Sequence, residues 1–172
     1  MQNLFSYPLK LEDMSTAVRR YELKASPEEL EFVADIMKVP SVKSFTAEIS
    51  VKLHKKEHLA DVWGSVDADV EQTSVISLEN FIHPYHADFA LKFDTKMTAA
   101  ELRELEFDFE DDVPDILDNG QIDLAAVAME QLALVLDDFP RREGEVFSFR
   151  SEFDEETAPR TNPFAVLKNL KK

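Results

Sequence analysis

Residues 45–70, FTAEISVKLHKKEHLADVWGSVDADV, contain the clearest structural signal in the chain. In the first half every second position is apolar: Phe45, Ala47, Ile49, Val51 and Leu53. The same period of two returns in the second half, at Val62, Gly64, Val66, Ala68 and Val70. This period is typical of half-buried strands, and the polar residues 54–58 between the two runs indicate a turn. The stretch therefore predicts a long antiparallel hairpin with one face in water.

The same alternation occurs on both sides of this hairpin. A third long strand is predicted from Tyr85 to Phe93, and a short one around Tyr21 and Leu23. Residues 4–11 also alternate, and Pro8 places that strand at an edge because proline has no N–H to donate. Together these runs predict an antiparallel sheet of long strands, either curved or barrel-like.

Two helices are predicted beside the sheet. Ser26-Pro27-Glu28-Glu29 combines an N-cap residue, a proline at the first helical position and a capping-box acid, and Pro40 ends the helix that follows. A second helix over residues 124–137 is capped by Asp123 and closed by Pro140. The expected fold class is therefore α+β, with the sheet flanked by helices.

Length and composition exclude several classes of protein. A chain of 172 residues with 44% apolar residues is expected to form one domain over residues 1–172. The absence of cysteine excludes disulfides and thiolate metal sites, and three scattered glycines cannot form a phosphate-binding loop. The longest apolar run, residues 124–136, is too short to span a bilayer. Because residues 1–12 lack the basic start and apolar run of a signal peptide, we expect a cytoplasmic protein.

Negative charge is concentrated in one part of the chain. The net charge is −16, yet residues 1–60 have nine acids and nine bases. Residues 101–118 have nine acids and one base, which indicates either a solvated, partly disordered connection or a docking strip for a basic protein. A basic partner is favoured over a general phosphate-binding surface. The acids selected as partner-binding candidates are Glu104, Glu106, Asp111 and Asp112.

Catalytic motifs give little support for an enzyme. His54, Glu57 and His58 match the H-x-x-E-H string of some zinc peptidases, but that chemistry needs a helix, and here a turn is expected. No G-x-S-x-G sequence is present, and we expect no catalytic residues, no metal and no cofactor. A zinc hydrolase and direct RNA binding remain the alternatives. The RNA alternative would use local basic residues: Arg19, Arg20, Lys52, Lys55, Lys56, Lys168, Lys171 and Lys172.

Residues 71–81, EQTSVISLENF, resemble the Q-T-C-x-x-[TC]-L-E-P-F stretch of the YceD family. Residues 64–70, GSVDADV, are similar to the G-x-[VL]-x-A-x-V strand before that stretch. Residues 122–124, 131–134 and 139–141 resemble the family's I-D-L…L-x-L-x-x-x-P block, and residues 162–170 its N-P-F-A-x-L-x-x-L terminus, in which a short helix is expected over 163–170. The general appearance is that of the alphaproteobacterial branch.

The resemblance implies a non-enzymatic factor for ribosome assembly, because the family is described as needed for accumulation of large-subunit ribosomal RNA. It suggests partner contacts in two segments, at Ser74, Ser77, Leu78, Glu79 and Phe81 and at Asn162, Pro163 and Phe164. The same residues could equally serve as a strand end and a helix cap. Many relatives have a cysteine pair where this chain has Ser74 and Ser77, so a thiol mechanism cannot operate here. The expected partner is a large-subunit precursor or a basic ribosomal protein.

Overall fold

The computed structural model describes residues 4–97, 115–117 and 120–147. The chain divides into a unit of residues Met1–Arg142 and a unit of residues Glu143–Lys172, and of the second unit residues 143–147 are described. The prediction of one domain over residues 1–172 stays a prediction, and the helix expected over 163–170 lies outside the described residues.

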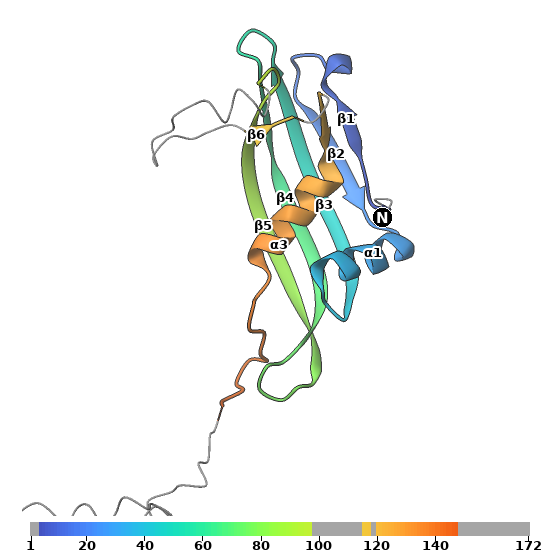
Figure 1. Cartoon of the computed structure of the whole chain (residues 1–172), viewed down its shortest axis with the longest axis vertical. Helices are drawn as coiled ribbons and strands as arrows, with labels where there is room; N and C mark the ends of the chain where they lie inside the picture. The colour runs from blue at the N-terminus through green and yellow to red at the C-terminus, as the bar shows by residue number, and fades with distance from the viewer. Residues whose placement is uncertain (1–3, 98–114, 118–119, 148–172) are drawn as a thin grey trace, which may run out of the picture. The chain divides into compact units, whose positions relative to one another are not determined.

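The first unit is built on a five-stranded sheet (Figure 1). Its strands, in spatial order, are β2 (Arg19–Lys24), β3 (Ser41–His54), β4 (Leu59–Thr73), β5 (Asn80–Asp94) and β6 (Asp115–Ile116). Neighbours are antiparallel except β5 and β6, which are parallel. The α+β prediction is confirmed, and the barrel-like alternative is wrong because the described strands form an open sheet that ends at β2 and β6.

The predicted hairpin and its turn are confirmed. Strands β3 and β4 pair along their length, with Val51 opposite Val62 and Ile49 opposite Gly64, and residues 55–58 form the turn. Strand β5 contains the third predicted strand, Tyr85 to Phe93, and begins earlier in the chain, at Asn80. Along most of its length β5 has no described partner on its far side, which explains how Pro84 fits into it without an N–H group.

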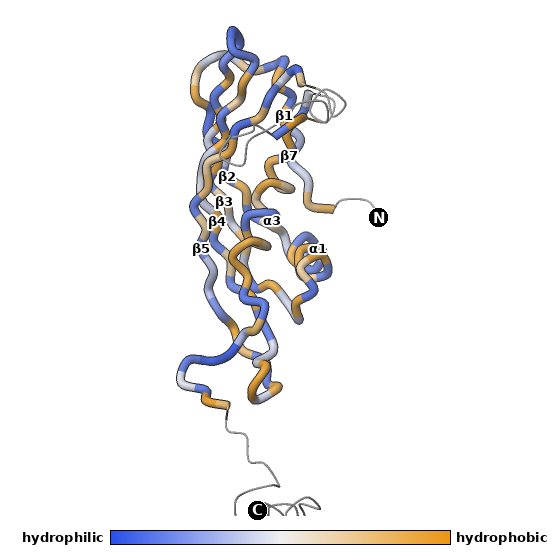
Figure 2. The backbone as a smooth tube through the Cα atoms, turned by 60° about the vertical axis from the view of Figure 1, so that its left-hand side comes forward, coloured by the Kyte–Doolittle hydropathy of each residue, from blue (hydrophilic) through white to orange (hydrophobic). Residues whose placement is uncertain are grey.

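Helices α1 (Pro27–Met37) and α3 (Leu124–Val135) lie on the same face of the sheet (Figures 1 and 2). The capping box of α1 is present, because Ser26 Oγ accepts from the Glu29 N–H and Glu29 Oε2 accepts from the Ser26 N–H. Lys38, with φ at 59°, ends this helix in the left-handed conformation. Asp123 caps α3 as predicted.

The core lies between this sheet face and the helices. Its fully buried members come from the inward positions of β3 and β4 and from both helices, including Phe45, Ile49, Val51, Val62, Val66, Val70, Val33, Leu124 and Leu132. The alternate positions of the strands face water and are mostly polar, as the period of two predicted.

One prediction about strands needs correction. The edge strand expected over residues 4–11 is limited to β1 (Pro8–Lys10), which pairs with β7 (Gln121–Asp123) in a separate two-stranded sheet, and Leu11–Asp13 form a 3-10 turn (η1). Both interpretations of residues 101–118, a solvated connection or a docking strip, stay predictions; Asp115 and Ile116 of this segment form β6 and pair with Phe93 and Asp94. Residues 98–114 and 118–119 lie outside the described part of the chain.

Within the described ranges, no helix is both long enough and apolar enough to cross a membrane.

Candidate functional site

The loop between β4 and β5, residues 74–79, contains most of the residues that the resemblance selects in the described chain. Ser74 is fully buried, and its Oγ accepts hydrogen bonds from the N–H groups of Ile76 at 3.1 Å and Ser77 at 3.3 Å. Its backbone also closes the loop, with the Ser74 N–H donating to the Glu79 carbonyl at 2.9 Å and the Ser74 carbonyl accepting from the Leu78 N–H at 3.0 Å. Ser74 therefore organises the loop. Its hydroxyl oxygen accepts the hydrogen bonds of Ile76 and Ser77 at a position where many relatives have a cysteine.

Four of the other five residues of this loop are exposed, and Ile76 is half-buried. Leu78 has a positive φ of 61° and a side chain that is 77% exposed, and Val75 is also exposed. Ser77 and Glu79 are exposed, whereas Phe81 is half-buried. A bulky residue in the left-handed region is uncommon and strained. The hydrogen bond from the Leu78 N–H to the Ser74 carbonyl holds Leu78 in this conformation.

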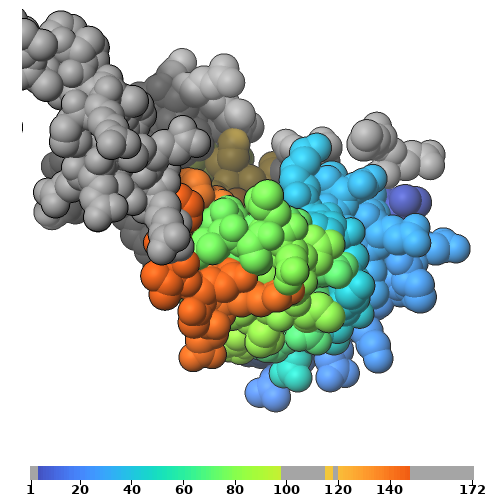
Figure 3. All heavy atoms as spheres, turned by 90° about the horizontal axis from the view of Figure 1, so that it is seen from below, coloured from blue at the N-terminus to red at the C-terminus, as the bar shows by residue number. Residues whose placement is uncertain are grey.

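The segment that follows α3 packs against this loop (Figure 3). The Val75 N–H donates to the carbonyl oxygen of Pro140 at 2.8 Å. The Arg142 guanidinium donates to Glu79 Oε2 and to the Asn80 carbonyl, both at 2.8 Å. Two stretches about sixty residues apart in the chain thus form one structure, and Glu79 has a defined partner within it.

A buried polar link joins the same two stretches. Gln72 is 4% exposed; its Nε2 donates to the Asp137 carbonyl at 3.3 Å, and its Oε1 accepts from the Tyr85 hydroxyl. Burial raises the pKa of Tyr85. Gln72, Tyr85 and Asp137 were not among the predicted site residues. One signal in the sequence could have indicated Gln72, because it is a polar residue at an inward position that continues the alternation Val66, Ala68, Val70.

A small cavity of about 350 Å³ lies next to this link. Its lining includes three rings from alternate positions of β5, those of Phe81, His83 and Tyr85, together with Pro140 and Arg141. The rings of His83 and Tyr85 meet edge to face with centroids 4.8 Å apart.

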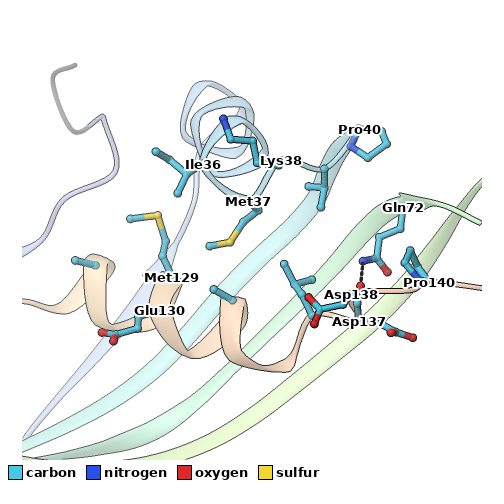
Figure 4. A pocket seen from close by; sticks show the side chains of 14 residues that line it. Ile36, Met37, Lys38, Pro40, Gln72, Met129, Glu130, Asp137, Asp138 and Pro140 are labelled. Carbon is cyan, nitrogen blue, oxygen red and sulfur yellow. Dashed lines mark hydrogen bonds between the residues drawn. The ribbon is translucent and has the colours of Figure 1, made fainter. Parts of the chain in front are cut away.

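A larger groove of about 590 Å³ lies between α1 and α3 (Figure 4). Its apolar lining comes from both helices and the residues after them: Ile36, Met37, Val39, Pro40, Ala126, Met129, Ala133, Leu136 and Pro140. The charged residues that line it are Glu130, Asp137 and Asp138 and, with the opposite sign, Lys38. Gln72 reaches this groove from β4, and Pro140, whose carbonyl oxygen accepts from the Val75 N–H of the loop, also lines it.

The outer face of the sheet carries two titratable groups with shifted pKa values. The Ser41 hydroxyl and the Lys43 ammonium, which lies 3.1 Å from Glu71, hold the pKa of the Glu71 carboxyl below its ordinary value. Hydrogen bonds to Asp67 at 2.8 Å and to Asp88 raise the pKa of His86.

The remaining candidates are placed as follows. Glu104, Glu106, Asp111, Asp112, Asn162, Pro163 and Phe164 lie outside the described residues, as do Lys168, Lys171 and Lys172. The structure brings the other predicted basic residues to one end of the sheet, because Arg19 and Arg20 pair with Val51 and Ser50 while Lys55 and Lys56 lie in the adjacent turn.

The H-x-x-E-H string lies at the end of β3 and in this turn, so the helix that zinc peptidase chemistry requires is not formed there. His54 Nε2 is 2.8 Å from Asp61 Oδ2, across the hairpin. In the part of the chain that the structure describes, no group of three or more histidine, cysteine or acidic side chains is arranged to hold a metal ion.

The chain is similar to a known protein family over residues 62–171. A family model described as large ribosomal RNA subunit accumulation protein YceD matches residues 62–171, which include most of β4, all of β5 and α3, and the loop organised by Ser74. No curated protein and no solved structure matches the chain. Since the family model covers more than half of the sequence, from the second strand of the long hairpin almost to the last residue, the chain belongs to the YceD family.

Proposed function

We propose that this protein supports accumulation of large-subunit ribosomal RNA in the cytoplasm as a non-catalytic assembly factor of the alphaproteobacterial type, by binding a basic ribosomal component. The family's description supports the role in ribosomal RNA accumulation. One observation supports the basic partner: residues 61–172 carry the whole net charge of −16, and this part of the chain coincides with the region that the family model matches, residues 62–171.

Such a charge distribution steers a basic protein toward one region of the chain. A field of one sign raises the rate of encounter with a partner of the opposite sign and repels RNA phosphates. We propose residues 101–118 as the main attractive segment, with Glu104, Glu106, Asp111 and Asp112 as contacts, and the exposed loop residues Ser77, Leu78 and Glu79 as further contacts. By the same resemblance, Asn162, Pro163 and Phe164 are proposed contacts.

The role in ribosomal RNA accumulation is tested in cells that lack the protein. The ratio of large- to small-subunit ribosomal RNA should fall, and the protein should co-sediment with large-subunit precursors on a sucrose gradient. An unchanged ratio, with the protein at the top of the gradient, would contradict the proposal.

The basic partner is tested with the purified chain and total protein extracted from large subunits. We expect the quadruple variant E104Q/E106Q/D111N/D112N to capture these proteins more weakly and with less dependence on salt. The matched control E12Q/D13N/E22Q/E31Q removes four exposed acids from the neutral part of the chain and should bind like the wild type. Equal loss in both variants would contradict a specific acidic segment.

One observation favours direct RNA binding as a second candidate. Arg19, Arg20, Lys52, Lys55 and Lys56 lie at one end of the sheet, where they could contact phosphates together. Binding of precursor ribosomal RNA to the purified chain should then fall steeply with salt, and K52Q/K55Q/K56Q should reduce that slope by about three. Absence of binding at low salt would remove this candidate.

A further inference from the structure

We propose that the groove between α1 and α3 binds an amphipathic, lysine- and arginine-rich segment of a protein partner. The apolar side chains of that segment would enter the groove, and its cations would meet the carboxylates at the rim. This proposal deepens the proposed function and rests on it for the identity of the partner as a ribosomal protein.

The two helices leave an apolar surface between them. Helix α1 packs on β3, whereas α3 packs on β4 and β5, so each helix covers its own part of the sheet. In Figure 4 the side chains of Ile36, Met37 and Met129 point into the space between the helices. Ile36 is 49% exposed at the edge of this apolar lining.

Helix α3 has more apolar surface than its packing on the sheet requires. Leu124, Ala128 and Leu132 are completely buried. A neighbouring row with helical spacing, Ala126, Met129, Glu130 and Ala133, lines the groove. Met129 is 8% exposed and also belongs to the core, whereas Glu130 and Ala133 are exposed. The exposed apolar side chains of the groove are therefore those of Ile36, Pro40 and Ala133, and these are the ones that a partner would cover.

The shape and chemistry of the lining suit a helical segment. Ala126 and Ala133 are small and leave room, while Met37 and Met129 can adapt to different apolar side chains. Grooves of this kind bind one apolar face of an amphipathic helix through residues spaced three and four apart.

The charge at the rim selects a basic segment and disfavours RNA. Three carboxylates, those of Glu130, Asp137 and Asp138, line the groove against the single ammonium of Lys38. Among the described residues, neither Glu130 nor Asp138 forms an ion pair, so both are available to cations of a partner. A nucleic acid would instead bring phosphates toward these acids.

The test uses the purified full chain and fluorescein-labelled peptides of leucine and lysine, read by fluorescence anisotropy. One peptide has its leucines at helical spacing, and a second has the same composition in scrambled order. We expect the patterned peptide to bind at least tenfold more tightly than the scrambled one. Equal binding of the two peptides would mean that charge alone attracts them, and it would contradict the proposed binding in the groove.

Two variants on neighbouring positions of α3 locate the binding site. Ala133 and Leu134 are both exposed, but only Ala133 lines the groove. Ala133→Arg places a guanidinium among the rim carboxylates and should weaken the patterned peptide about tenfold or more, whereas Leu134→Arg should stay within twofold of the wild type. Circular dichroism confirms that both fold. Equal affinity of the two variants would overturn the proposal, as would binding of a single-stranded oligouridylate that displaces the patterned peptide.

The failure of this inference is separable from that of the proposed function. The peptide assay reads the groove on the purified chain, and the ribosomal RNA ratio reads the function in cells. Suppose that the ratio of large- to small-subunit ribosomal RNA falls in cells lacking the protein, but the patterned peptide does not bind. Binding in the groove is then contradicted, and the role in ribosomal RNA accumulation is supported. A normal ribosomal RNA ratio with intact peptide binding would contradict the role in ribosomal RNA accumulation and support binding in the groove.

Discussion

At the scale of single residues, Gly64 shows how closely two strands can approach. A Cβ built on Gly64 would lie 2.0 Å from the carbonyl oxygen of Glu48 and 2.9 Å from the Cα of Ile49, both in the backbone of β3. Because these atoms belong to the backbone of the paired strand, they cannot move aside as a flexible side chain would. A glycine inside a strand often marks such an approach, so the glycine of the G-x-[VL]-x-A-x-V resemblance has a packing role here.

We therefore expect Gly64→Ala to lower the free energy of unfolding by about 3 kcal/mol, because the added methyl group forces β3 and β4 apart. Urea denaturation measures the effect. Ser65→Ala, at the next position of the same strand, should change the free energy by less than about 0.5 kcal/mol. Similar values for the two variants would show that the strands separate easily at this point.

The Ser74 hydroxyl gives a second residue-scale prediction. Ser74→Ala removes the acceptor of two N–H groups in a buried position, which should cost about 1–3 kcal/mol of the free energy of unfolding. Ser77→Ala removes an exposed hydroxyl three residues later and should cost clearly less. Thermal unfolding of both variants makes the comparison. A larger effect at Ser77 would contradict the central place of Ser74 in the loop.

His86 gives a prediction about pH. Asp67 and Asp88 raise its pKa in the folded chain, so protonation of His86 stabilises the fold. This contribution is fully present below the unfolded-state pKa of about 6.5. It is lost as the pH rises through the higher folded-state pKa. In an NMR titration, Asp67→Asn should lower the pKa of His86. Asp35→Asn on α1 should leave it unchanged, and an equal shift in both variants would contradict the local cause.

At the scale of elements, Asp123 connects β7, α3 and the residues that lead into β1. Its carboxylate accepts from the Ser6 hydroxyl at 2.6 Å, the Tyr7 N–H at 2.8 Å and the N–H groups of Ala125 and Ala126 at 3.1 and 3.3 Å. It thus caps α3 and also fixes the residues before β1. The sequence indicated the cap alone, since the other two donors are more than one hundred residues away.

We expect Asp123→Ala to cost about 2 kcal/mol of the free energy of unfolding, more than an N-cap alone. The matched variant is Ser26→Ala, which removes the cap of α1 without a long-range contact and should cost about 1 kcal/mol. Chemical denaturation gives both values. Equal costs would mean that the contacts to Ser6 and Tyr7 contribute nothing.

At the scale of the first unit, the strands differ in how well they are supported. Strands β3 and β4 are paired on both sides and line the core, whereas β1 and β7 pair only with each other over three residues. Local opening should therefore require the most free energy in β3 and β4 and the least in β1 and β7.

Amide hydrogen exchange measures this difference. Peptides from β3 and β4 should exchange most slowly, and those from β1 and β7 most quickly among the strands. Asp123→Ala should accelerate exchange in β1 and β7 and leave β3 and β4 unchanged. Acceleration of all four together would indicate a single cooperative unit instead.

The sequence alone determined the parts of this protein that depend on neighbouring residues. The periods of two and 3.6, the capping box and the cap at Asp123 predicted the long hairpin, the third strand and both helices, and the resemblance at residues 64–81 identified the family. Tertiary structure decided the pairing of β1 with β7, the strand at Asp115–Ile116, the burial of Ser74 and Gln72, and the groove between α1 and α3. The physical reason is range: backbone periodicity and caps act within a few residues, whereas burial and pairing depend on which distant surfaces meet.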